Sequence, residues 1–393
     1  MIEAFVHLVE KGLGKFLSYK KLVELSSKLN FPLAPPLIAS VDVTLRCNSK
    51  CSYCDIWRIK EDFQEVSLDN LDRIFRSLKK LGVRMVSLSG GEPLLRNDLE
   101  EIISLVKYHD MTVNVSTNGI LLTRERALTL AAAGVDSLIL SLDTLDPEVY
   151  ERHRGVPFKL AERALSSLLY ISNKYSVLWA AINCVITRHN IDTLVPFVNW
   201  ISEYGGGRIS VTLQPYQRPT PFSEISHLPP KMQKQAKELL PYYQNKSSHD
   251  DLIPGPELRP VFENEIQELT RLKKLKPGLP LNDSEFYLRS IPGFLFDNKM
   301  PSGFDCVAGY VGIFIRSDLL VCPCWQLLPV GDLENAELTD IWFSQRFRKQ
   351  RVAMKHLKCP GCIALCHSRE PGWWEWYNAL YKSRRSEAPR VAR

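Results

Sequence analysis

Two hydrophobic patterns alternate along the first half of the chain. Short runs of apolar, β-branched residues predict buried strands, and segments with apolar residues every three or four positions predict helices. The predicted strands are Leu37–Val43, Val83–Ser89, Thr112–Val115, Leu138–Leu142, Val177–Ile186 and Arg208–Leu213. The predicted helices are Leu68–Leu81, Asp98–Tyr108, Arg124–Ala133, Lys159–Asn173 and Ile191–Tyr204. Six such units with crossovers indicate an α/β fold whose parallel sheet is rolled into a partial barrel.

Several helix ends are marked by residues that favour them. Ser67, Asn97 and Thr123 stand just before predicted helices, where a side-chain oxygen can accept a hydrogen bond from the first turn. Gly82 and Gly134 follow helix ends, where a residue with left-handed backbone is expected.

The second half has a different pattern. Residues Arg218 to Met300 are rich in proline and charge and contain two predicted helices, Lys231–Leu240 and Pro260–Leu275. We expect this region to bridge the two halves of the chain and to cover the open mouth of the barrel. Further on, Ile313–Val321 is typical of a β-hairpin, and Leu338–Trp342 is helical.

Composition and charge narrow the class of protein. The chain has 393 residues, of which 45% are hydrophobic, enough for one large domain and a smaller one. It has no run of about 18 apolar residues that would span a membrane, and Glu3 and Glu10 interrupt any secretory signal. The net charge of +6 is spread along the chain except for a basic tail, which predicts a solvated end rather than a nucleic-acid site. We therefore expect a cytoplasmic enzyme with no nucleic-acid partner.

The ten cysteines fall into two groups, apart from Cys184, which lies inside a predicted strand and is expected to be a buried small hydrophobe. The first group is the C-x3-C-x2-C run of Cys47, Cys51 and Cys54, directly after the first strand. Three thiolates can hold three irons of a 4Fe-4S cluster and leave the fourth iron open to a small ligand. A structural zinc site is the alternative, but zinc requires four ligands, and no histidine or further cysteine is close in sequence.

A second motif follows the second strand. Gly90 and Gly91 allow close approach of the backbone to a ligand, and the carboxylate of Glu92, before Pro93, can receive an ammonium group. A tight turn is the alternative interpretation of such a motif in isolation. Its position one βα unit after the cysteine run favours a shared site.

Together, the cysteine run and Gly90-Gly91-Glu92-Pro93 resemble the motifs of the radical S-adenosylmethionine (SAM) superfamily. The resemblance covers Leu37 to Gln217 and implies a (β/α)6 partial TIM-type barrel with a 4Fe-4S cluster that binds SAM. It implies that Gly90, Gly91, Glu92 and Pro93 bind the methionine amino group of SAM and that Tyr53 packs near the adenine.

Polar residues at other strand ends are candidates for further contacts with SAM or substrate. From relatives in this superfamily, we select Ser141, Asn183 and Arg188 for this role. The alternatives are structural. Thr117-Asn-Gly119 is a plausible turn, and Asp143 is a plausible helix cap.

The second cysteine group follows an order of cysteine, hairpin, cysteine, helix and C-x2-C. It resembles the C-terminal auxiliary-cluster domains called SPASM and twitch. The six cysteines are too few for the seven of the full SPASM pattern, so the resemblance implies one auxiliary 4Fe-4S cluster. Its expected ligands are Cys306, Cys324, Cys359 and Cys362, with Cys366 and Cys322 as substitutes. Leu319 departs from the glycine usual in the hairpin, which leaves the choice between Cys322 and Cys324 open, and a zinc knuckle is the alternative.

These expectations divide the chain into five parts. They are an N-terminal helical segment (1–36), the barrel (37–217), the bridge (218–300), the auxiliary-cluster domain (301–370) and an aromatic, basic tail (371–393). The helical pattern Ile2–Leu29 and the aromatic segment Trp373–Tyr377 either pack on the barrel or contact a membrane surface.

The function implied by the resemblance is reductive cleavage of SAM to a 5′-deoxyadenosyl radical that abstracts hydrogen from a peptide or small metabolite. The auxiliary cluster would assist oxidation or bind substrate, and an electron donor such as ferredoxin or flavodoxin would supply the electron. Two alternatives remain, namely a lipid substrate at a membrane surface and a non-catalytic iron–sulfur electron carrier. An electron carrier has no use for Gly90-Gly91-Glu92-Pro93.

Overall fold

The computed structural model describes residues 17–54, 56–58, 65–175, 178–217, 250–302, 306–355 and 362–363, together with Trp374, Tyr377 and Leu380. Several predicted features therefore lie wholly or partly outside the described residues. They are the helix Lys231–Leu240, the first part of Ile2–Leu29, the start of the strand at Val177, Cys359, Cys366 and most of the aromatic, basic tail.

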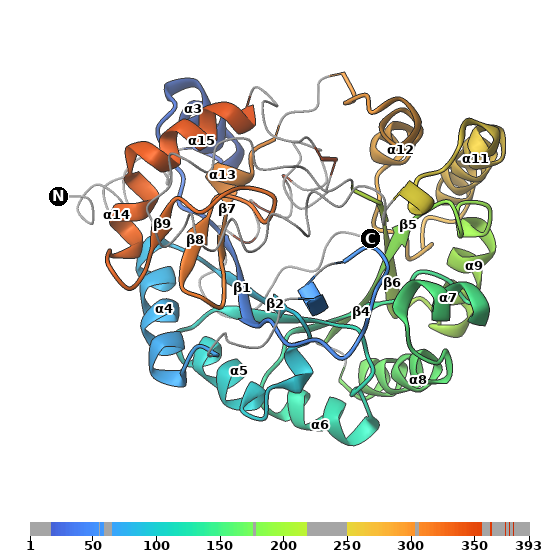
Figure 1. Cartoon of the computed structure of the whole chain (residues 1–393), viewed down its shortest axis with the longest axis horizontal. Coiled ribbons are helices and arrows are strands. Elements are labelled where there is room, and N and C mark those ends of the chain that lie inside the picture. The colour runs from blue at the N-terminus through green and yellow to red at the C-terminus, as the bar shows by residue number, and fades with distance from the viewer. Residues whose placement is uncertain are drawn as a thin grey trace.

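Parallel strands form the centre of the fold (Figure 1). They are β1 (Ile38–Thr44), β2 (Met85–Gly90), β3 (Thr112–Thr117), β4 (Ser137–Ser141), β5 (Trp179–Ile186) and β6 (Ile209–Pro215). Strands that are consecutive in sequence are neighbours in the sheet, with Ile38 opposite Met85 and Ala180 opposite Ile209. All six predicted strands are confirmed to within two residues at each end.

Helices connect the strands and cover the outer side of the sheet (Figure 1). Those of the barrel are α4 (Leu68–Leu81), α5 (Leu99–Tyr108), α6 (Arg124–Ala132), α7 (Pro147–Arg154), α8 (Lys159–Lys174) and α9 (Leu194–Tyr204). Short 3-10 turns lie at η2 (Ile56–Arg58), η3 (Pro93–Leu95), η6 (Asp250–Leu252) and η7 (Pro256–Leu258). The sheet does not close, because β6 lies at one edge, so the predicted α/β partial barrel is confirmed.

Most of the predicted helix caps are confirmed. The Ser67 and Thr123 side chains accept hydrogen bonds from the first turns of α4 and α6. Gly82 and Gly134 adopt positive φ values of 100° and 97° after the same two helices.

One expected cap was wrong, and one alternative interpretation is excluded. Helix α5 begins after Asp98 rather than after Asn97, and the Asp98 side chain makes no capping hydrogen bond. Its carboxylate is instead held by the guanidinium of Arg96, at 2.7 and 2.6 Å. Asp146, not Asp143, caps α7, since the Asp146 side chain accepts from the first turn of that helix. Asp143 is thereby left for other contacts.

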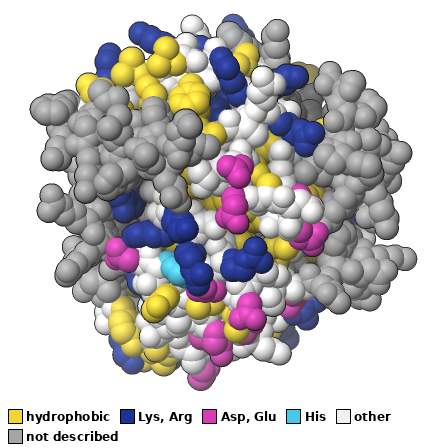
Figure 2. All heavy atoms as spheres, turned by 90° about the vertical axis from the view of Figure 1, so that its left-hand side faces the viewer, with side chains coloured by type: hydrophobic (Ala, Val, Ile, Leu, Met, Phe, Trp, Pro, Cys, Tyr) yellow, Lys and Arg dark blue, Asp and Glu magenta, His cyan; other side chains and the backbone are white. Residues whose placement is uncertain are grey.

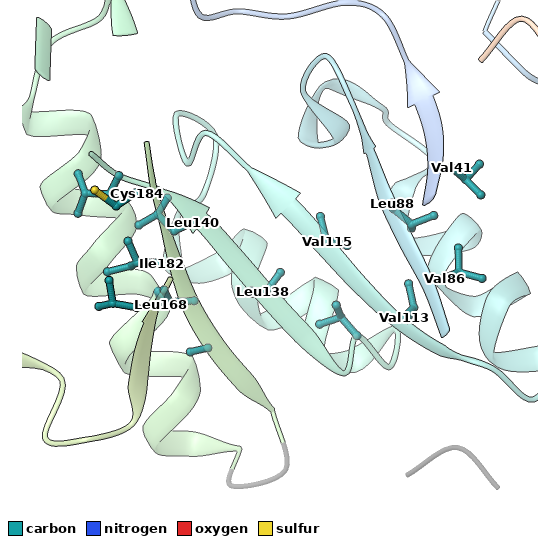
Figure 3. Close-up of a cluster of buried hydrophobic side chains, with 14 of the residues drawn as sticks. Val41, Val86, Leu88, Val113, Val115, Leu138, Leu140, Leu168, Ile182 and Cys184 are labelled. Atoms are coloured by element: carbon teal, nitrogen blue, oxygen red, sulfur yellow. The ribbon is translucent and has the colours of Figure 1, made fainter. Parts of the chain in front are cut away.

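The main core lies between the strands and the outer helices. Figure 3 shows its centre, with Val41, Val86, Leu88, Val113, Val115, Leu138, Leu140, Leu168, Ile182 and Cys184 labelled. Cys184 is fully buried, as expected for a small hydrophobe. Because side chains alternate across a strand, the residues between these positions face the inside of the barrel. These inner residues are mostly polar, with Ile139, Ala181 and Val185 among the apolar exceptions; the polar ones include Ser40, Asp42, Ser87, Ser89, Asn114, Ser116, Ser141, Asn183, Ser210, Thr212 and Gln214.

The predicted hairpin is present and extends the barrel sheet. Strand β7 (Gly312–Ile315) pairs in parallel with β1, and β8 (Leu320–Cys322) pairs antiparallel with β7. The short strand β9 (Gly331–Asp332) forms the far edge, and the predicted helix that follows is α14 (Leu338–Phe343). The cysteines of the C-terminal region are therefore attached to the same sheet that carries the first cysteine run.

Leu319 lies in the turn of this hairpin with φ of 67°, a left-handed conformation that glycine adopts without strain. We expect Leu319→Gly to be more stable than Leu319→Ala by about 1 kcal/mol, because alanine keeps the Cβ that strains this conformation. Denaturant unfolding of the two variants, prepared without metal, measures the difference. If Leu319→Ala were more stable than Leu319→Gly, as is usual at positions with negative φ, the prediction would be wrong.

The bridging region packs against the open edge of the barrel. Helix α11 (Arg259–Leu275) confirms the second predicted helix of this region, and α12 (Glu285–Asp297) follows it. Between them, the backbone of residues 280–282 hydrogen-bonds to Val211 on β6, and the Asp283 carboxylate accepts from the Leu213 N–H. These contacts, which include an isolated parallel bridge between Val211 and Leu281, satisfy backbone groups on the edge of β6 that faces away from β5.

Described residues from the N-terminal and C-terminal regions pack together on the side of the barrel opposite α11 and α12 (Figure 1). Helix α3 (Tyr19–Leu29) packs with α13 (Ala308–Val311), and α15 (Gln345–Lys355) completes the region. Tyr19 contacts the rings of Trp374 and Tyr377, with centroids 6.5 and 5.9 Å apart, and all three side chains are buried. The described aromatic residues of the tail thus pack inward.

The face over this region carries mixed charge. Figure 2 shows Lys and Arg side chains beside Asp and Glu side chains on it. None of the helices in the described ranges is long and apolar enough to cross a membrane.

Candidate active site at the carboxyl ends of the strands

The first cysteine run forms the loop that leaves the carboxyl end of β1. Cys51 is buried, and Cys47 and Cys54 are half-buried. Polar groups lie against two of the sulfurs, because Asn118 Nδ2 lies 3.9 Å from Cys47 Sγ and the Ser49 hydroxyl, which donates its hydrogen to Arg154 O, lies 3.2 Å from Cys51 Sγ. Burial raises the pKa of the Cys47 thiol to about 11. The loop therefore offers thiols in a sheltered, hydrogen-bonded setting.

The Gly90–Gly91 segment lies directly against the approach to this loop. Gly91 N–H donates to Thr44 O, and Glu92 N–H donates to Arg46 O, both at 2.8 Å. A Cβ on Gly90 would lie 2.2 Å from Thr44 O, and one on Gly91 would lie 2.1 Å from Arg46 O. The two glycines are thus required for contact between the end of β2 and the cysteine loop, a packing role that the sequence alone did not indicate.

Glu92 is almost fully buried, with 1% of its surface exposed. Its carboxylate accepts hydrogen bonds from Thr117 Oγ1 and Asn118 N–H, both at 2.7 Å, and from Leu94 N–H at 3.1 Å. Burial raises the pKa of Glu92, and these hydrogen bonds oppose the rise. The side chain thus joins the ends of β2 and β3, a contribution to stability that the motif alone did not predict.

We expect Glu92→Gln to weaken SAM binding roughly ten- to a hundredfold, since a hydrogen bond to a charged group contributes about 1.5–3 kcal/mol. Because the amide can replace only one carboxylate oxygen as acceptor, the free energy of unfolding should also fall by about 1–3 kcal/mol. Equilibrium binding of SAM and denaturant unfolding measure the two effects separately. Glu148→Gln, at an exposed position on α7, is the control. Lower stability with unchanged SAM affinity would make Glu92 a structural residue only.

A buried ion pair lies beneath the cysteine loop. The Arg154 guanidinium donates through Nε and Nη2 to the two oxygens of Asp143, each at 2.8 Å, and its Nη1 lies 3.9 Å from Cys51 Sγ. The Tyr53 hydroxyl also donates to Asp143, at 2.8 Å. Sequence reasoning placed Asp143 at a candidate strand end, with a helix cap as the alternative, and did not select it. It did not identify Arg154, because no local pattern links residues 103 positions apart.

The remaining predicted contact residues divide into two places. Ser141 and Asn183 are register partners on β4 and β5, and the Asn183 amide lies 3.4 Å from Gln214 Oε1 on β6. Arg188 lies beyond β5, where its guanidinium approaches Asp251 at 3.8 Å and Glu257 at 4.0 Å. Ser141 and Asn183 are thus brought together, whereas Arg188 is paired with the bridging region.

Asp42 is an additional acidic residue on the inner face of the barrel that sequence reasoning did not select. Ser89 Oγ, its register partner, donates to Asp42 Oδ1 at 3.0 Å. Burial raises the pKa of Asp42 to about 7, while the Ser89 hydrogen bond and the nearby charge of Arg316 oppose the rise. A signal was available in the sequence, because the carboxylate between Val41 and Val43 interrupts the apolar run of β1 and must face the side opposite to these valines.

The described cysteines of the second group lie on both sides of the hairpin. Cys306 precedes α13, Cys322 is buried within β8, and Cys324 follows that strand in a half-buried loop. Cys362 is half-buried, and Cys359 and Cys366 lie outside the described residues. Gln326, two residues after Cys324, donates through its amide to Gln217 Oε1 at 2.6 Å. The loop that carries Cys324 therefore reaches across to the end of β6.

Family models match both halves of this arrangement. Residues 41–201 match the radical SAM superfamily, and residues 306–367 match the SPASM model, described as an iron–sulfur cluster-binding domain. The chain belongs to the radical SAM superfamily. Radical SAM domains carry a 4Fe-4S cluster and SAM, and the SPASM domain implies auxiliary iron–sulfur chemistry in the C-terminal region.

Curated radical SAM relatives match part of the chain. The mycofactocin maturase MftC of Mycolicibacterium smegmatis is 31% identical over 209 residues, which are 53% of this chain and 52% of that protein. A probable GTP 3′,8-cyclase of Methanococcus maripaludis is 44% identical over 114 residues, which are 28% of this chain and 38% of that protein. The chain thus spans about half the length of MftC and less of the cyclase.

Solved structures support the same fold over more of the chain. Streptococcus suis SuiB bound to its precursor peptide SuiA gives a TM-score of 0.60 at 20% identity, covering 95% of this chain and 79% of SuiB. The anSMEcpe protein with bound AdoMet gives a TM-score of 0.56 at 16% identity, covering 80% of this chain and 82% of that chain. At these identities the comparison concerns the fold alone, and it agrees with the partial TIM barrel described above.

The residues of the first loop fit a 4Fe-4S cluster, because each of its three thiols can take one iron of the cluster. Hydrogen-bond donors to the sulfurs, here Asn118 and Arg154, are the outer contacts expected around cluster ligands.

Proposed function

We propose that this protein is a radical SAM enzyme that abstracts hydrogen from a polar substrate, a peptide or a small metabolite. The observation that carries the proposal is the contact between the cysteine loop and the Gly90–Glu92 segment, joined by the hydrogen bonds to Thr44 O and Arg46 O. When bound, the cluster and SAM supply the 5′-deoxyadenosyl radical that removes the hydrogen atom. The protein binds and orients SAM and the substrate and excludes water from the site.

The individual roles follow from position. Cys47, Cys51 and Cys54 would hold the cluster, and Gly90 to Pro93 would bind the methionine end of SAM. Ser141 and Asn183, as register partners at neighbouring strand ends, are placed to contact the nucleoside or the substrate together. Arg188 is the weakest of the proposed contacts, since its side chain is paired with Asp251 and Glu257.

The inner face of the barrel supports a polar substrate rather than a lipid. Its polar side chains carry mainly hydroxyl and amide groups, and Asp42 adds a carboxylate near the carboxyl end of β1. Such groups can pair with the N–H, C=O and O–H groups of a peptide or polar metabolite, whereas an acyl chain would leave most of them without a hydrogen-bond partner. The burial of Trp374 and Tyr377 removes two of the aromatic residues that a membrane-facing tail would use.

The relatives favour a peptide among polar substrates. MftC is a maturase by name, and SuiB has been solved with a precursor peptide. By analogy, we infer a peptide substrate for this chain, with an external electron donor such as ferredoxin or flavodoxin. A purely electron-carrying protein is disfavoured, because Gly90 to Pro93 would then have no ligand to bind.

For the C-terminal region we propose one auxiliary cluster. Cys324 is the better ligand of the Cys322 and Cys324 pair, because it lies in an irregular, half-buried loop, whereas Cys322 is 2% exposed within β8. Cys306, Cys359 and Cys362 would complete the set, with Cys366 as a substitute. We retain the five domain boundaries predicted above as part of this proposal.

The test is turnover of SAM by the anaerobically reconstituted and reduced protein, with 5′-deoxyadenosine measured by chromatography. Formation of 5′-deoxyadenosine supports the radical enzyme. A protein that holds iron and sulfide, accepts electrons and forms no 5′-deoxyadenosine would instead be an electron carrier.

A further inference from the structure

Among the described residues, Arg154 is the charged side chain that makes a hydrogen-bond contact with a sulfur of the first cysteine run. It is the last residue of α7, and its side chain is 6% exposed. Two of its nitrogens face the Asp143 carboxylate at 2.8 Å, and the third faces Cys51 Sγ at 3.9 Å. The guanidinium thus bridges a carboxylate and a candidate cluster ligand.

The geometry of this bridge is fixed from several sides. Asp143 also accepts hydrogen bonds from the Tyr53 hydroxyl at 2.8 Å and from Val185 N–H at 2.9 Å. The Arg154 guanidinium lies 5.2 Å from the centroid of the Tyr53 ring. Although burial alone would lower the pKa of Arg154, the charge of Asp143 raises it well above its usual value. The side chain therefore carries a permanent positive charge in a buried place.

The backbone of the same residue holds the cysteine loop. Arg154 O accepts hydrogen bonds from Ser49 Oγ at 2.7 Å and from Lys50 N–H at 3.1 Å, and His153 O accepts from Ser52 N–H at 2.8 Å. The end of α7 thus fixes the distance between the guanidinium and Cys51. The electrostatic interaction between the Arg154 charge and the Cys51 sulfur therefore acts at a constant distance.

We propose that Arg154 is a positioning residue whose charge raises the reduction potential of the cluster on Cys47, Cys51 and Cys54. This inference rests on the proposed function, since it needs a cluster at these cysteines. One-electron reduction adds one negative charge to the cluster and its thiolates, and a cation at fixed distance stabilises the more negative state. Asp143 opposes this effect while it keeps the guanidinium in place.

A purely structural role would have different consequences. If Arg154 only supported the structure, it would contribute to stability and iron retention. The direction in which its removal shifted the reduction potential of the cluster would then not depend on its charge. Removal of the cation and removal of the anion would then not move the potential in opposite directions. The sign of the shift is therefore the measurement that separates the two roles.

The experiment is a redox titration of the full-length, reconstituted protein, followed by electron paramagnetic resonance of the reduced cluster that SAM perturbs. Arg154→Met should lower the ratio of reduced to oxidised cluster about tenfold at a given potential, a shift of 59 mV for one electron. Arg154→Lys keeps the charge and should restore most of the ratio. Asp143→Asn should shift the potential upward, opposite to Arg154→Met.

Lys107→Met is the matched control. Lys107 pairs with Asp136 at 2.9 Å, just before the start of β4, whereas Asp143 follows the end of the same strand. Loss of this distant cation should leave the potential unchanged.

The outcomes can be separated from failure of the proposed function. An unaltered protein that assembles no cluster perturbed by SAM would contradict the function itself. Equal potentials in the unaltered protein and Arg154→Met, with equal iron content, would overturn only the role of Arg154. If Arg154→Met loses iron, Asp143→Asn and Arg154→Lys decide, and a downward or absent shift in Asp143→Asn overturns the inference.

Discussion

Replacing Cys51 by Ala is expected to abolish the conversion of SAM to 5′-deoxyadenosine by the reduced, reconstituted protein. With only Cys47 and Cys54 left in the loop, a 4Fe-4S cluster would have two irons without a thiolate, and such a cluster is not retained in a defined, SAM-binding form. The amount of 5′-deoxyadenosine formed by this variant should fall to the limit of detection, because cleavage requires the cluster and binding of SAM alone does not suffice. Product is measured after anaerobic incubation with a chemical reductant.

The control for this variant is Cys184→Ala, which also removes one buried thiol. Cys184 lies in β5 within the main core, so its replacement should cost some stability and leave cleavage in place. Iron content is measured on both variants, so that loss of activity is traced to loss of the first cluster. Cleavage by Cys51→Ala at a rate near that of the unaltered chain would remove the central claim about the cysteine loop.

The fold was largely predictable because its parallel strands are buried on one face by helices and leave a strong local signal. Val83–Ser89, for example, differs from β2 by no more than two residues. Helix α7 was missed, since half of its eight residues are charged and its only large apolar residues are Val149 and Tyr150. The pairing of β7 with β1 was also not predicted, because local periodicity carries no information about which distant strands pair.

In the candidate site, too, some features could be predicted from the sequence and others could not. The cysteine run and Gly90 to Pro93 are contiguous in sequence, so their chemistry can be read from residue type and spacing. The contacts around them come from segments far apart, such as Arg154 against Cys51 and Thr117 against Glu92. These pairs depend on how neighbouring strand ends are brought together by the sheet. Sequence patterns therefore gave the candidate ligands but not the charges and hydrogen bonds that surround them.

The second large effect concerns the C-terminal cysteines, whose arrangement is separate from the first loop. We expect a variant with Cys47, Cys51 and Cys54 all replaced by Ala to retain about four irons per chain, against about eight in the unaltered protein, since one cubane cluster needs four thiolates. The C-terminal region should stay folded in this variant, because β7 pairs with residues 38–41 of β1 and not with the cysteine loop.

Iron, sulfide and zinc measured on this triple variant decide between an auxiliary cluster and a zinc knuckle. Four irons with four sulfides would support one auxiliary cluster, and further replacement of Cys324 by Ala should then remove it, whereas Cys322→Ala should not, because Cys322 lies buried within β8. One zinc and no iron would reassign Cys306, Cys324, Cys359 and Cys362 to a structural site. A zinc ion has no accessible redox change, so that result would also remove any electron-accepting role from the C-terminal region and leave the first loop as the sole redox centre of the proposed reaction.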